Sequence, residues 1–272
     1  MKIGILYICT GKYDIFWNGF YKSAEKYLLP NTEKHYFVFT DSEQIQSSNK
    51  IHKIYQQQLG WPKDTLMRFH LFLNIEKDLK QMDFLFFFNA NYTFVKSITE
   101  NEILPTEKDN FLIGQIHPVA YHKNRTDFNY EANAVSTAFV EADKGSYYFA
   151  GGLIGGRTVE FIRMCYQLKN NIDKDFQNNI IAIWHDESHI NKFFSETEPK
   201  KLHPGFCYPQ DWYLPFEQKT LLLDKNKFGG HGYLRGEKSQ TNSEWIQSKL
   251  FYAKLVFRGM IYKISGKSFY NK

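Results

Sequence analysis

The chain has 272 residues, of which 43% are hydrophobic and 18% aromatic, enough for the core of one large domain or two small ones. The formal net charge of +5 is mild, so nucleic acid is a weak candidate partner, and an acidic ligand or membrane surface fits better. No apolar stretch reaches the length of about 18 residues that suggests a membrane span, and the apolar start, residues 1–9, is too short for a signal peptide. Cys9, Cys165 and Cys207 lack the paired spacing of a disulfide framework or a zinc ribbon, so we expect a globular cytoplasmic protein.

Short apolar runs alternate with helical periodicity along the first part of the chain, and this alternation predicts an α/β fold built around a sheet. The expected strands are residues 2–9, 35–40, 51–55, 84–88 and 111–116. A helix is expected over residues 66–79, with Asp64 or Thr65 as its cap and Arg68 near its beginning. The polar residues 106–145 show little periodicity, so we expect long surface loops there, where binding residues are common.

The apolar run of residues 84–88 ends abruptly in Asn89-Ala90-Asn91. In open α/β sheets, ligands bind outside the carboxyl ends of strands, and many nucleotide-sugar transferases place an Asp-any-Asp pair there to hold a metal ion. A hard cation prefers anionic oxygens, and both positions here are amides. Asn89 and Asn91 therefore indicate either a metal-free variant of such a site or a polar strand terminus.

A dense ionisable cluster, residues 184–194, follows an apolar run and begins a predicted helix with Asp186 or Ser188 near its start. His185 and His189 are four apart, but a zinc-protease helix needs Glu directly after the first His, so a zinc hydrolase ranks last. Glu187 could act as a nucleophile or stabilise an oxocarbenium-like centre. The alternative is a capped surface helix with routine charges.

Two further segments could belong to a site. Residues 147–156 hold two diglycines, which either let a sugar lie close to the backbone or form a turn between strands. Lys225 and Lys227 would pair with phosphate oxygens if their segment folded over a site, or would be solvated. Residues 244–263 carry Lys249, Lys254 and other cations among apolar residues and predict a basic amphipathic helix, packed on its own domain or lying on an anionic membrane.

Taken together and in order, these segments resemble glycosyltransferase family 6, the family of the histo-blood-group A and B transferases and the α1,3-galactosyltransferases. The resemblance covers roughly residues 1–230. It rests on residues 36–41, Arg68, residues 89–91, His117-Pro118, residues 128–131, residues 150–152 with Gly155-Gly156, and residues 184–188. It implies a GT-A fold with a mixed sheet flanked by helices, and transfer with retention at the anomeric carbon.

The resemblance also implies a division of the chain. A catalytic domain would span residues 1–232, with a nucleotide-binding part at about 1–115 and an acceptor-binding part at about 116–232. The basic tail, residues 233–272, lies beyond the resemblance. If it docks on a membrane, the cytoplasmic enzyme would be peripheral on the inner face.

Residue roles follow from the resemblance position by position. Glu187 becomes the catalytic carboxylate. The donor-binding residues would be Ile8, Thr10, Tyr13, Arg68, Asn89, Ala90, Asn91, Ala150, Gly151, Gly152, His185, Asp186, Lys225 and Lys227. The acceptor-binding residues would be His117, Asn129, Trp184 and Asp211.

The amides at Asn89 and Asn91 depart from the aspartates of the animal enzymes and are similar to the bacterial branch, which works without metal. We therefore expect no metal and no cofactor, with Lys225, Lys227 and Arg68 supplying positive charge to the diphosphate. By the resemblance, small residues at Ala150 and Gly152 favour UDP-N-acetylgalactosamine as donor. The expected acceptor is the galactose of a fucosylated, H-like glycan. The alternatives are UDP-galactose as donor, or a carbohydrate-binding protein that has lost catalysis.

Overall fold

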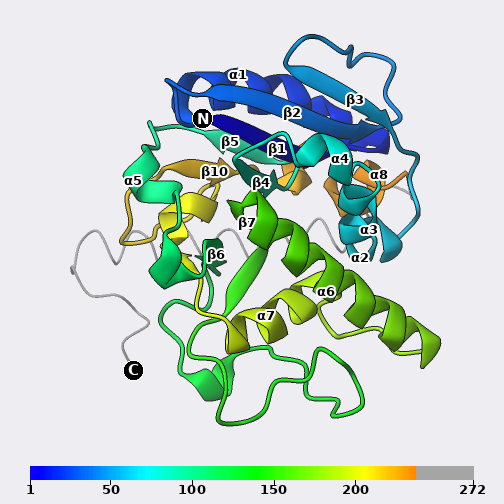
Figure 1. Cartoon of the computed structure of the whole chain (residues 1–272), viewed down its shortest axis with the longest axis vertical. Coiled ribbons are helices and arrows are strands. Elements are labelled where there is room, and N and C mark those ends of the chain that lie inside the picture. The colour runs from blue at the N-terminus through cyan, green and yellow to red at the C-terminus, as the bar shows by residue number, and fades with distance from the viewer. Residues whose placement is uncertain (237–272) are drawn as a thin grey trace.

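The computed structural model describes residues 1–236, so the helix expected at residues 244–263, and its membrane contact, lie outside the described part. Seven strands form one mixed sheet in the order β3-β2-β1-β4-β7-β6-β8. Figure 1 labels all of them except β8. Their bounds are β1 Lys2–Ile8, β2 Glu33–Thr40, β3 Ile51–Tyr55, β4 Phe84–Phe88, β6 Leu112–Ile116, β7 Phe149–Arg157 and β8 Lys200–Leu202. β1 to β4 pair in parallel, whereas β7 is antiparallel to both β4 and β6.

A second sheet of three short strands continues from the end of β4. It has the order β5-β10-β9, with β5 at Tyr92–Phe94, β9 at Tyr208–Pro209 and β10 at Thr220–Leu222. The Leu223 N–H donates to the Asn91 carbonyl at 2.8 Å, which ties the late segment after β10 to the strand end of β4. The second sheet thus brings residues 208–224 beside the edge of the main sheet.

Helices cover both faces of the main sheet (Figure 1). The α-helices are α1 Trp17–Tyr27, α2 Lys63–Leu66, α3 Arg68–Leu73, α4 Glu76–Leu79, α5 Glu100–Ile103, α6 Thr158–Gln177, α7 Asp186–Glu196 and α8 Gly230–Leu234. The 3-10 helices are η1 Gly11–Phe16, η2 Glu107–Asp109, η3 Arg125–Asp127, η4 Pro204–Cys207 and η5 Lys225–Phe228. No helix within residues 1–236 combines the length and apolarity needed to cross a membrane.

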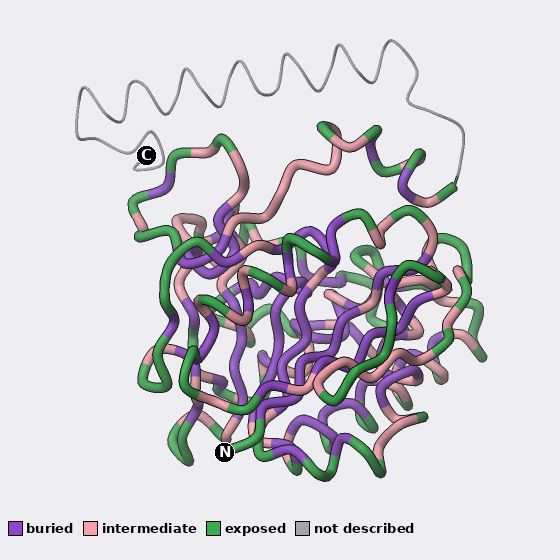
Figure 2. Tube along the Cα trace, turned by 90° about the horizontal axis from the view of Figure 1, so that it is seen from above, coloured by how far each residue is buried: buried purple, intermediate pink, exposed green. Residues whose placement is uncertain are grey.

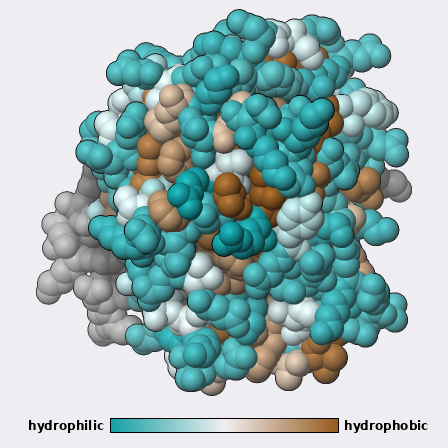
Figure 3. All heavy atoms as spheres, viewed as in Figure 1, coloured by the Kyte–Doolittle hydropathy of each residue, from teal (hydrophilic) through white to brown (hydrophobic). Residues whose placement is uncertain are grey.

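Side chains of β4 alternate between two apolar layers, which explains why its sequence is apolar throughout. Phe86 and Phe88 pack in the layer with α1, whereas Leu85 and Phe87 pack in the layer with α3 and α6. The three cysteines are free and buried: Cys9 and Cys207 lie in the first layer and Cys165 in the second. Buried residues accordingly follow the strands through the centre of the molecule (Figure 2). On the face drawn in Figure 3, hydrophilic side chains cover most of the surface and hydrophobic ones show in small groups.

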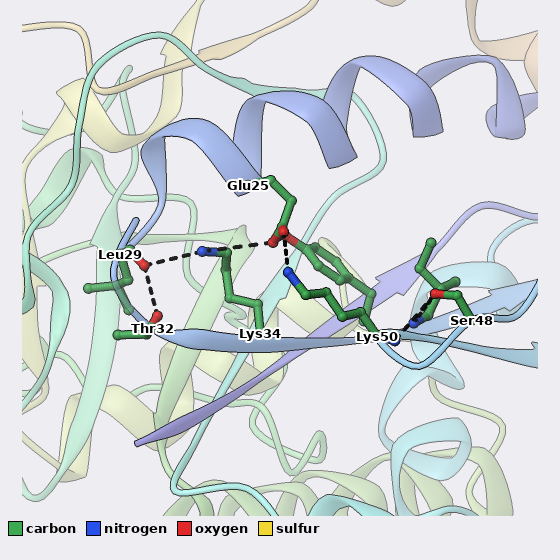
Figure 4. Close-up of polar contacts among 8 residues, drawn as sticks. Glu25, Leu29, Thr32, Lys34, Ser48 and Lys50 are labelled. Carbon is green, nitrogen blue, oxygen red and sulfur yellow. Dashed lines mark hydrogen bonds and ion pairs between the residues drawn. The ribbon is translucent and has the colours of Figure 1, made fainter.

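A polar cluster fastens the end of α1 to β2 and to the turn before β3 (Figure 4). Glu25 accepts hydrogen bonds from Lys50 at 2.7 Å and from the Tyr36 hydroxyl at 2.9 Å. The buried Lys34 ammonium lies 3.8 Å from Glu25 and donates to the Leu29 carbonyl at 3.2 Å. Burial raises the pKa of Glu25, but the hydrogen bonds from Lys50 and Tyr36 bring it below the ordinary value. The cluster thereby satisfies a charge buried beside the first layer.

The structure confirms the five predicted strands and corrects two other predictions. Residues 63–79 form α2, α3 and α4 instead of one helix, because Met67 and Ile75 depart from helical backbone angles (ψ 2° and 23°). Asp64 and Thr65 do not cap a helix: Asp64 accepts from the Leu59 N–H at 2.7 Å and Thr65 donates to the Pro62 carbonyl at 3.0 Å.

The diglycines form no turn between strands, because residues 149–157 are the continuous strand β7. The reason is close packing between neighbouring strands. A Cβ atom at Gly155 would collide with the Phe86 ring and lie 2.6 Å from the Leu85 carbonyl oxygen. One at Gly156 would lie 2.8 Å from the Leu112 side chain on the other neighbouring strand. Glycine is therefore needed here to let β7 fit between β4 and β6.

Candidate active site

The carboxyl ends of β1 and β4 meet the first half of β7 at one edge of the main sheet. β1 and β4 are parallel, so the residues that follow them, including Asn89, lie at the same edge. β7 runs the opposite way, and its Gly152 carbonyl accepts a hydrogen bond from the Asn89 N–H at 2.9 Å. The amide-rich strand end and the first diglycine, far apart in sequence, are thus side by side.

Two adjoining cavities lie at this edge and share Asn89 and Lys225. The first, called the β1 cavity, has a volume of about 120 Å³ and is lined by Ile8, Thr10, Tyr13, Gln58, Trp61, Asp64, Thr65, Arg68, Phe87, Asn89, Ala90, Lys225 and Arg235. The second, called the β4 cavity, has a volume of about 450 Å³ and its lining includes Asn89, Asn91, Tyr92, His117, Ala150, Gly152, Glu187, Cys207, Trp212, Lys225 and His231. A ligand with two chemically different ends could occupy both.

The Glu187 carboxylate faces the β4 cavity from the first turn of α7. One oxygen, Oε2, accepts a hydrogen bond from the Gly151 N–H at 2.8 Å, and the other, Oε1, accepts one from the Tyr148 hydroxyl at 2.9 Å. Burial raises the pKa of Glu187 above its ordinary value, although both hydrogen bonds act to lower it. The carboxylate is therefore fixed in direction at the wall of the cavity.

Arg68 and Asp186 form a buried ion pair behind Glu187, with the guanidinium Nη2 2.8 Å from Asp186 Oδ2. Arg68 also donates to the Gly151 carbonyl at 2.6 Å and stacks 4.4 Å above the Phe87 ring. Burial raises the pKa of Asp186, and the positive charge of Arg68 opposes that rise. Asp186 lines neither cavity, so it acts on the site by holding Arg68, which lines the β1 cavity.

Positive charge gathers at the β1 cavity. Lys225, from η5, stands 5.3 Å from the Tyr13 ring centre, and within residues 1–236 it has no ion-pair partner. Burial lowers the pKa of Lys225 to about 8, and Arg235 and Arg68 act in the same direction. The Arg235 guanidinium stacks 3.6 Å above the Trp61 ring. Cations that repel one another at a partly buried site favour an anionic ligand.

Asn89 and Asn91 offer neutral oxygens where a hard divalent cation would favour carboxylates. Asn91 donates through Nδ2 to the Leu223 carbonyl at 2.7 Å, so this amide holds the late segment against the strand end. Its Oδ1 is buried without a hydrogen bond among the described residues. Residues 1–236 contain no group of three or more His, Cys, Asp or Glu side chains placed to hold a metal ion. The side chains at the end of β4 are thus two amides, without a carboxylate pair.

His185 and His189 do not converge, which contradicts the zinc-hydrolase interpretation. The His185 ring contacts the Trp61 ring, with centroids 4.6 Å apart. His189 is buried, with Nε2 3.7 Å from Asp175 Oδ2 of α6. Burial lowers the pKa of His189 to about 4, so this ring is neutral near pH 7.

The cavities bring together most of the residues predicted from the sequence. In the β1 cavity these are Ile8, Thr10, Tyr13, Arg68, Asn89, Ala90 and Lys225. In the β4 cavity they are Asn89, Asn91, His117, Ala150, Gly152, Glu187 and Lys225. Gly151 and Asp186 lie behind the wall, bonded to Glu187 and Arg68 respectively.

Besides Gly151 and Asp186, five predicted site residues line neither cavity. Lys227 forms an ion pair with Asp211 instead of facing the site, so the two satisfy each other. Asn129 and Trp184 are exposed outside both cavities, and His185 packs on Trp61.

Sequence reasoning missed other residues that line the site: Gln58, Trp61 and Arg235 at the β1 cavity, and Tyr92, Trp212 and His231 at the β4 cavity. Tyr92 directly follows the Asn89-Ala90-Asn91 motif, and this adjacency was the available signal. Trp61 and Arg235 carried none, because their stacking joins distant parts of the chain.

The sequence profile of glycosyltransferase family 6 matches residues 1–228. The chain belongs to glycosyltransferase family 6. It is therefore a glycosyltransferase, and its seven-stranded mixed sheet flanked by helices is the GT-A-like fold expected for that family. The predictions of family, fold class and enzyme class are confirmed.

Relatives within this family include proteins from bacteria and animals. The O-antigen biosynthesis glycosyltransferase WbnI of Escherichia coli is 33% identical, over 86% of this chain and 100% of its own length. Globoside alpha-1,3-N-acetylgalactosaminyltransferase 1 of Homo sapiens is 30% identical, over 83% of this chain and 67% of its own length. Histo-blood group ABO system transferase 1 of Rattus norvegicus is 28% identical, over 76% of this chain and 61% of its own length. Glycosyltransferases of this family thus act with a nucleotide-sugar donor and a glycan acceptor, and so does this chain.

Proposed function

We propose that this family 6 member is a retaining α1,3-N-acetylgalactosaminyltransferase that moves N-acetylgalactosamine from UDP to the galactose of a fucosylated, H-like acceptor without a metal ion. One observation carries the proposal. A cation-lined cavity and a cavity walled by a fixed carboxylate share Lys225, as expected if a nucleoside diphosphate occupies one and its sugar the other.

In this mechanism the diphosphate lies between Lys225, Arg235 and Arg68 in the β1 cavity. As the bond from the anomeric carbon to the diphosphate oxygen breaks, these cations stabilise the negative charge that develops on the leaving group. Fixed cations of the chain thereby take the place that a divalent ion would hold. The neutral amides at Asn89 and Asn91 support this metal-free arrangement.

Glu187 would stabilise the oxocarbenium-like centre of the sugar from the β4 cavity. The acceptor 3-hydroxyl attacks the anomeric carbon on the face from which the diphosphate departs, so configuration is retained. Its proton passes to the departing diphosphate oxygen, which leaves as UDP. His117 and Trp212, which line the same cavity, are candidates for contact with the acceptor.

The choice of N-acetylgalactosamine rests on small residues at Ala150 and Gly152 and on the activity for which the human relative is named. One observation favours UDP-galactose as a second candidate. A Cβ atom at Gly152 would lie 3.0 Å from Asn89 Nδ2 and 3.3 Å from the Tyr92 hydroxyl, so these two side chains already occupy much of the space beside the glycine. The C2 hydroxyl of galactose is smaller than the acetamido group of N-acetylgalactosamine and would need less room there.

Product formation from UDP-N-acetylgalactosamine and from UDP-galactose, each with 2′-fucosyllactose and with or without excess EDTA, tests the proposal. We expect transfer of N-acetylgalactosamine to continue in the presence of EDTA. In Glu187→Gln the transfer rate should fall about 10²–10³-fold while UDP binding stays intact. Loss of transfer with EDTA would contradict the metal-free assignment. Faster transfer from UDP-galactose would make UDP-galactose the donor in place of UDP-N-acetylgalactosamine. UDP binding without transfer from either donor would indicate a carbohydrate-binding protein or a different acceptor.

A further inference from the structure

Tyr148 stands between the Glu187 carboxylate and the segment that carries His117. Its hydroxyl donates to Glu187 Oε1 at 2.9 Å, and its side chain is buried. Its ring lies 5.8 Å from the His117 ring, which lines the β4 cavity. Tyr148 itself lines neither cavity, so it reaches the reacting atoms only through Glu187.

The ring of Tyr148 belongs to a third apolar cluster, separate from the two layers of the main sheet. Its members are Ala120, Phe128, Tyr130, Val140 and Tyr148. The Tyr148 ring lies 5.5 Å from the Tyr130 ring and 6.1 Å from the Phe128 ring. The loops expected from residues 106–145 are therefore packed onto the residue that holds the catalytic carboxylate.

The backbone of Glu187 is fixed without help from Tyr148. Asn191, one turn further along α7, accepts from the Phe149 N–H at 2.8 Å and donates to the Phe149 carbonyl at 2.8 Å. Its amide also donates to the Glu187 carbonyl at 2.9 Å. These bonds dock α7 on β7, so the Tyr148 hydroxyl acts on the Glu187 side chain and not on its backbone, together with the Gly151 N–H.

We propose that Tyr148 is a positioning residue, which holds the Glu187 carboxylate at the wall of the β4 cavity and couples it to the packing of residues 117–148. The inference rests on the proposed function, because it assigns Tyr148 a part in the same transfer. The Tyr148 hydroxyl and the Gly151 N–H each occupy one lone-pair position, on different oxygens of the carboxylate.

The hydroxyl also tunes the charge on Glu187. Titratable groups that interact with Glu187 come from every neighbouring element: Arg68 of α3, Tyr92 of β5, Tyr148 before β7, Asp186 of α7 and Cys207 of η4, while His117, Lys225 and His231 line the same cavity. Burial raises the pKa of Glu187, and the bond from Tyr148 lowers it. Removing the hydroxyl leaves the effect of burial less opposed, so the carboxylate would take up its proton at a higher pH.

Tyr148→Phe tests the proposal, because it deletes the donor and keeps the ring. We expect kcat to fall about 10- to 100-fold, the factor set by one hydrogen bond to a charged group. The KM for the UDP-sugar should stay unchanged, and the acid limb of the pH profile of kcat should move to higher pH. Tyr130→Phe is the matched control: its hydroxyl, in the same cluster, donates to the Tyr147 carbonyl at 2.6 Å and does not touch Glu187.

A direct titration separates this inference from the proposed function. The pKa of the Glu187 carboxyl, followed by ¹³C NMR with UDP bound, should rise in Tyr148→Phe and stay at the wild-type value in Tyr130→Phe. An unchanged Glu187 pKa and an unchanged kcat in Tyr148→Phe would overturn the positioning role. A wild-type protein without transferase activity would overturn the proposed function instead, and the titration would still decide what Tyr148 does to Glu187.

Discussion

The positive charge of Lys225 is destabilised by burial and by the nearby Arg235 and Arg68. Lys225 lines both cavities, and the described residues, 1–236, offer it no carboxylate partner. Because burial and the nearby arginines bring its pKa to about 8, a bound anion would raise that pKa and gain binding energy in return. The side chain is therefore suited to a diphosphate and to the charge that grows on it as the sugar departs.

Lys225→Ala should lower kcat/KM for the UDP-sugar by about 10- to 100-fold, since one hydrogen bond between charged groups is lost. The wild-type kcat/KM should also fall as pH rises through about 8, where Lys225 of the free enzyme loses its proton, and this basic limb should be absent from the variant. Initial rates across the alkaline range test both points. Lys227→Ala is the matched control, since Lys227 is paired with Asp211. Equal losses in the two variants would show that Lys225 has no special role.

The site residues that the sequence could indicate are those marked by a local pattern of neighbouring residues. Asn89 and Glu187 stand out because a polar group ends an apolar run or begins a helix there. The roles of Trp61 and Arg235 depend on a stacking contact between distant segments, which no local pattern encodes. Lys227 was predicted to face the site, but its charge is satisfied by Asp211, a partner that only the fold brings close.

Asp175, near the end of α6, anchors one of the long loops beside α7. Its carboxylate accepts from the Ser136 hydroxyl at 2.6 Å and from the Thr137 N–H at 2.8 Å. The Thr137 hydroxyl also donates to the Asn171 carbonyl at 3.0 Å on the same helix. These contacts hold the loop against α6, which packs on α7, the helix that carries Glu187.

Asp175→Asn should lower the free energy of unfolding by about 1–3 kcal/mol, because an amide cannot accept at both positions and leaves a buried donor unpaired. The KM for the acceptor should rise while the KM for the UDP-sugar stays constant. Asp173 lies on the same helix, is 35% exposed and pairs with His70. Asp173→Asn should therefore lower the free energy of unfolding by less than about 1 kcal/mol. Urea unfolding and two-substrate kinetics would show this difference, and identical behaviour of the two variants would contradict the anchoring role.

The helices predicted from sequence periodicity formed as expected only where tertiary packing favoured the same helix. α7 begins where the polar cluster after residue 184 predicts a helix. Residues 66–79 have helical periodicity, yet breaks at Met67 and Ile75 divide them into short helices, one of which aims Arg68 at the Gly151 carbonyl. Tertiary contacts here override local preference. α6 was not predicted as an element of its own, although Phe161, Leu168 and Ile172 mark its buried face.

The main sheet combines five strands that the sequence predicts with two that it does not, β7 and β8. Apolar runs marked β1, β4 and β6, because strands buried on both faces must be apolar throughout. β7 occupies a central position between β4 and β6, but its glycines lack the side chains that favour strands. Its place depends on packing against Phe86 and Leu112, which are distant in sequence.

Gly155→Ala should lower the free energy of unfolding by about 1–3 kcal/mol, because a methyl group would collide with the Phe86 ring at the β4–β7 contact. Gly19→Ala provides the control. Gly19 lies on an exposed turn of α1 with no atom within 4 Å of an added Cβ, so the same substitution should stabilise the protein by about 0.5–1 kcal/mol. Urea midpoints of the two variants should move in opposite directions. A Gly155→Ala protein as stable as wild type would mean that β7 can shift away from β4.

The three buried thiols give each layer of the molecule its own chemical reporter. Cys9 and Cys207 lie on the α1 side of the sheet, whereas Cys165 is on the buried face of α6 on the other side. Burial raises the pKa of Cys9 and of Cys207 to about 12 and that of Cys165 well above the ordinary value, so the reactive thiolate is scarce in the folded state. An alkylating reagent can then modify each cysteine only during a transient opening of the structure around it. The labelling rate of each cysteine therefore measures how often its side of the sheet opens.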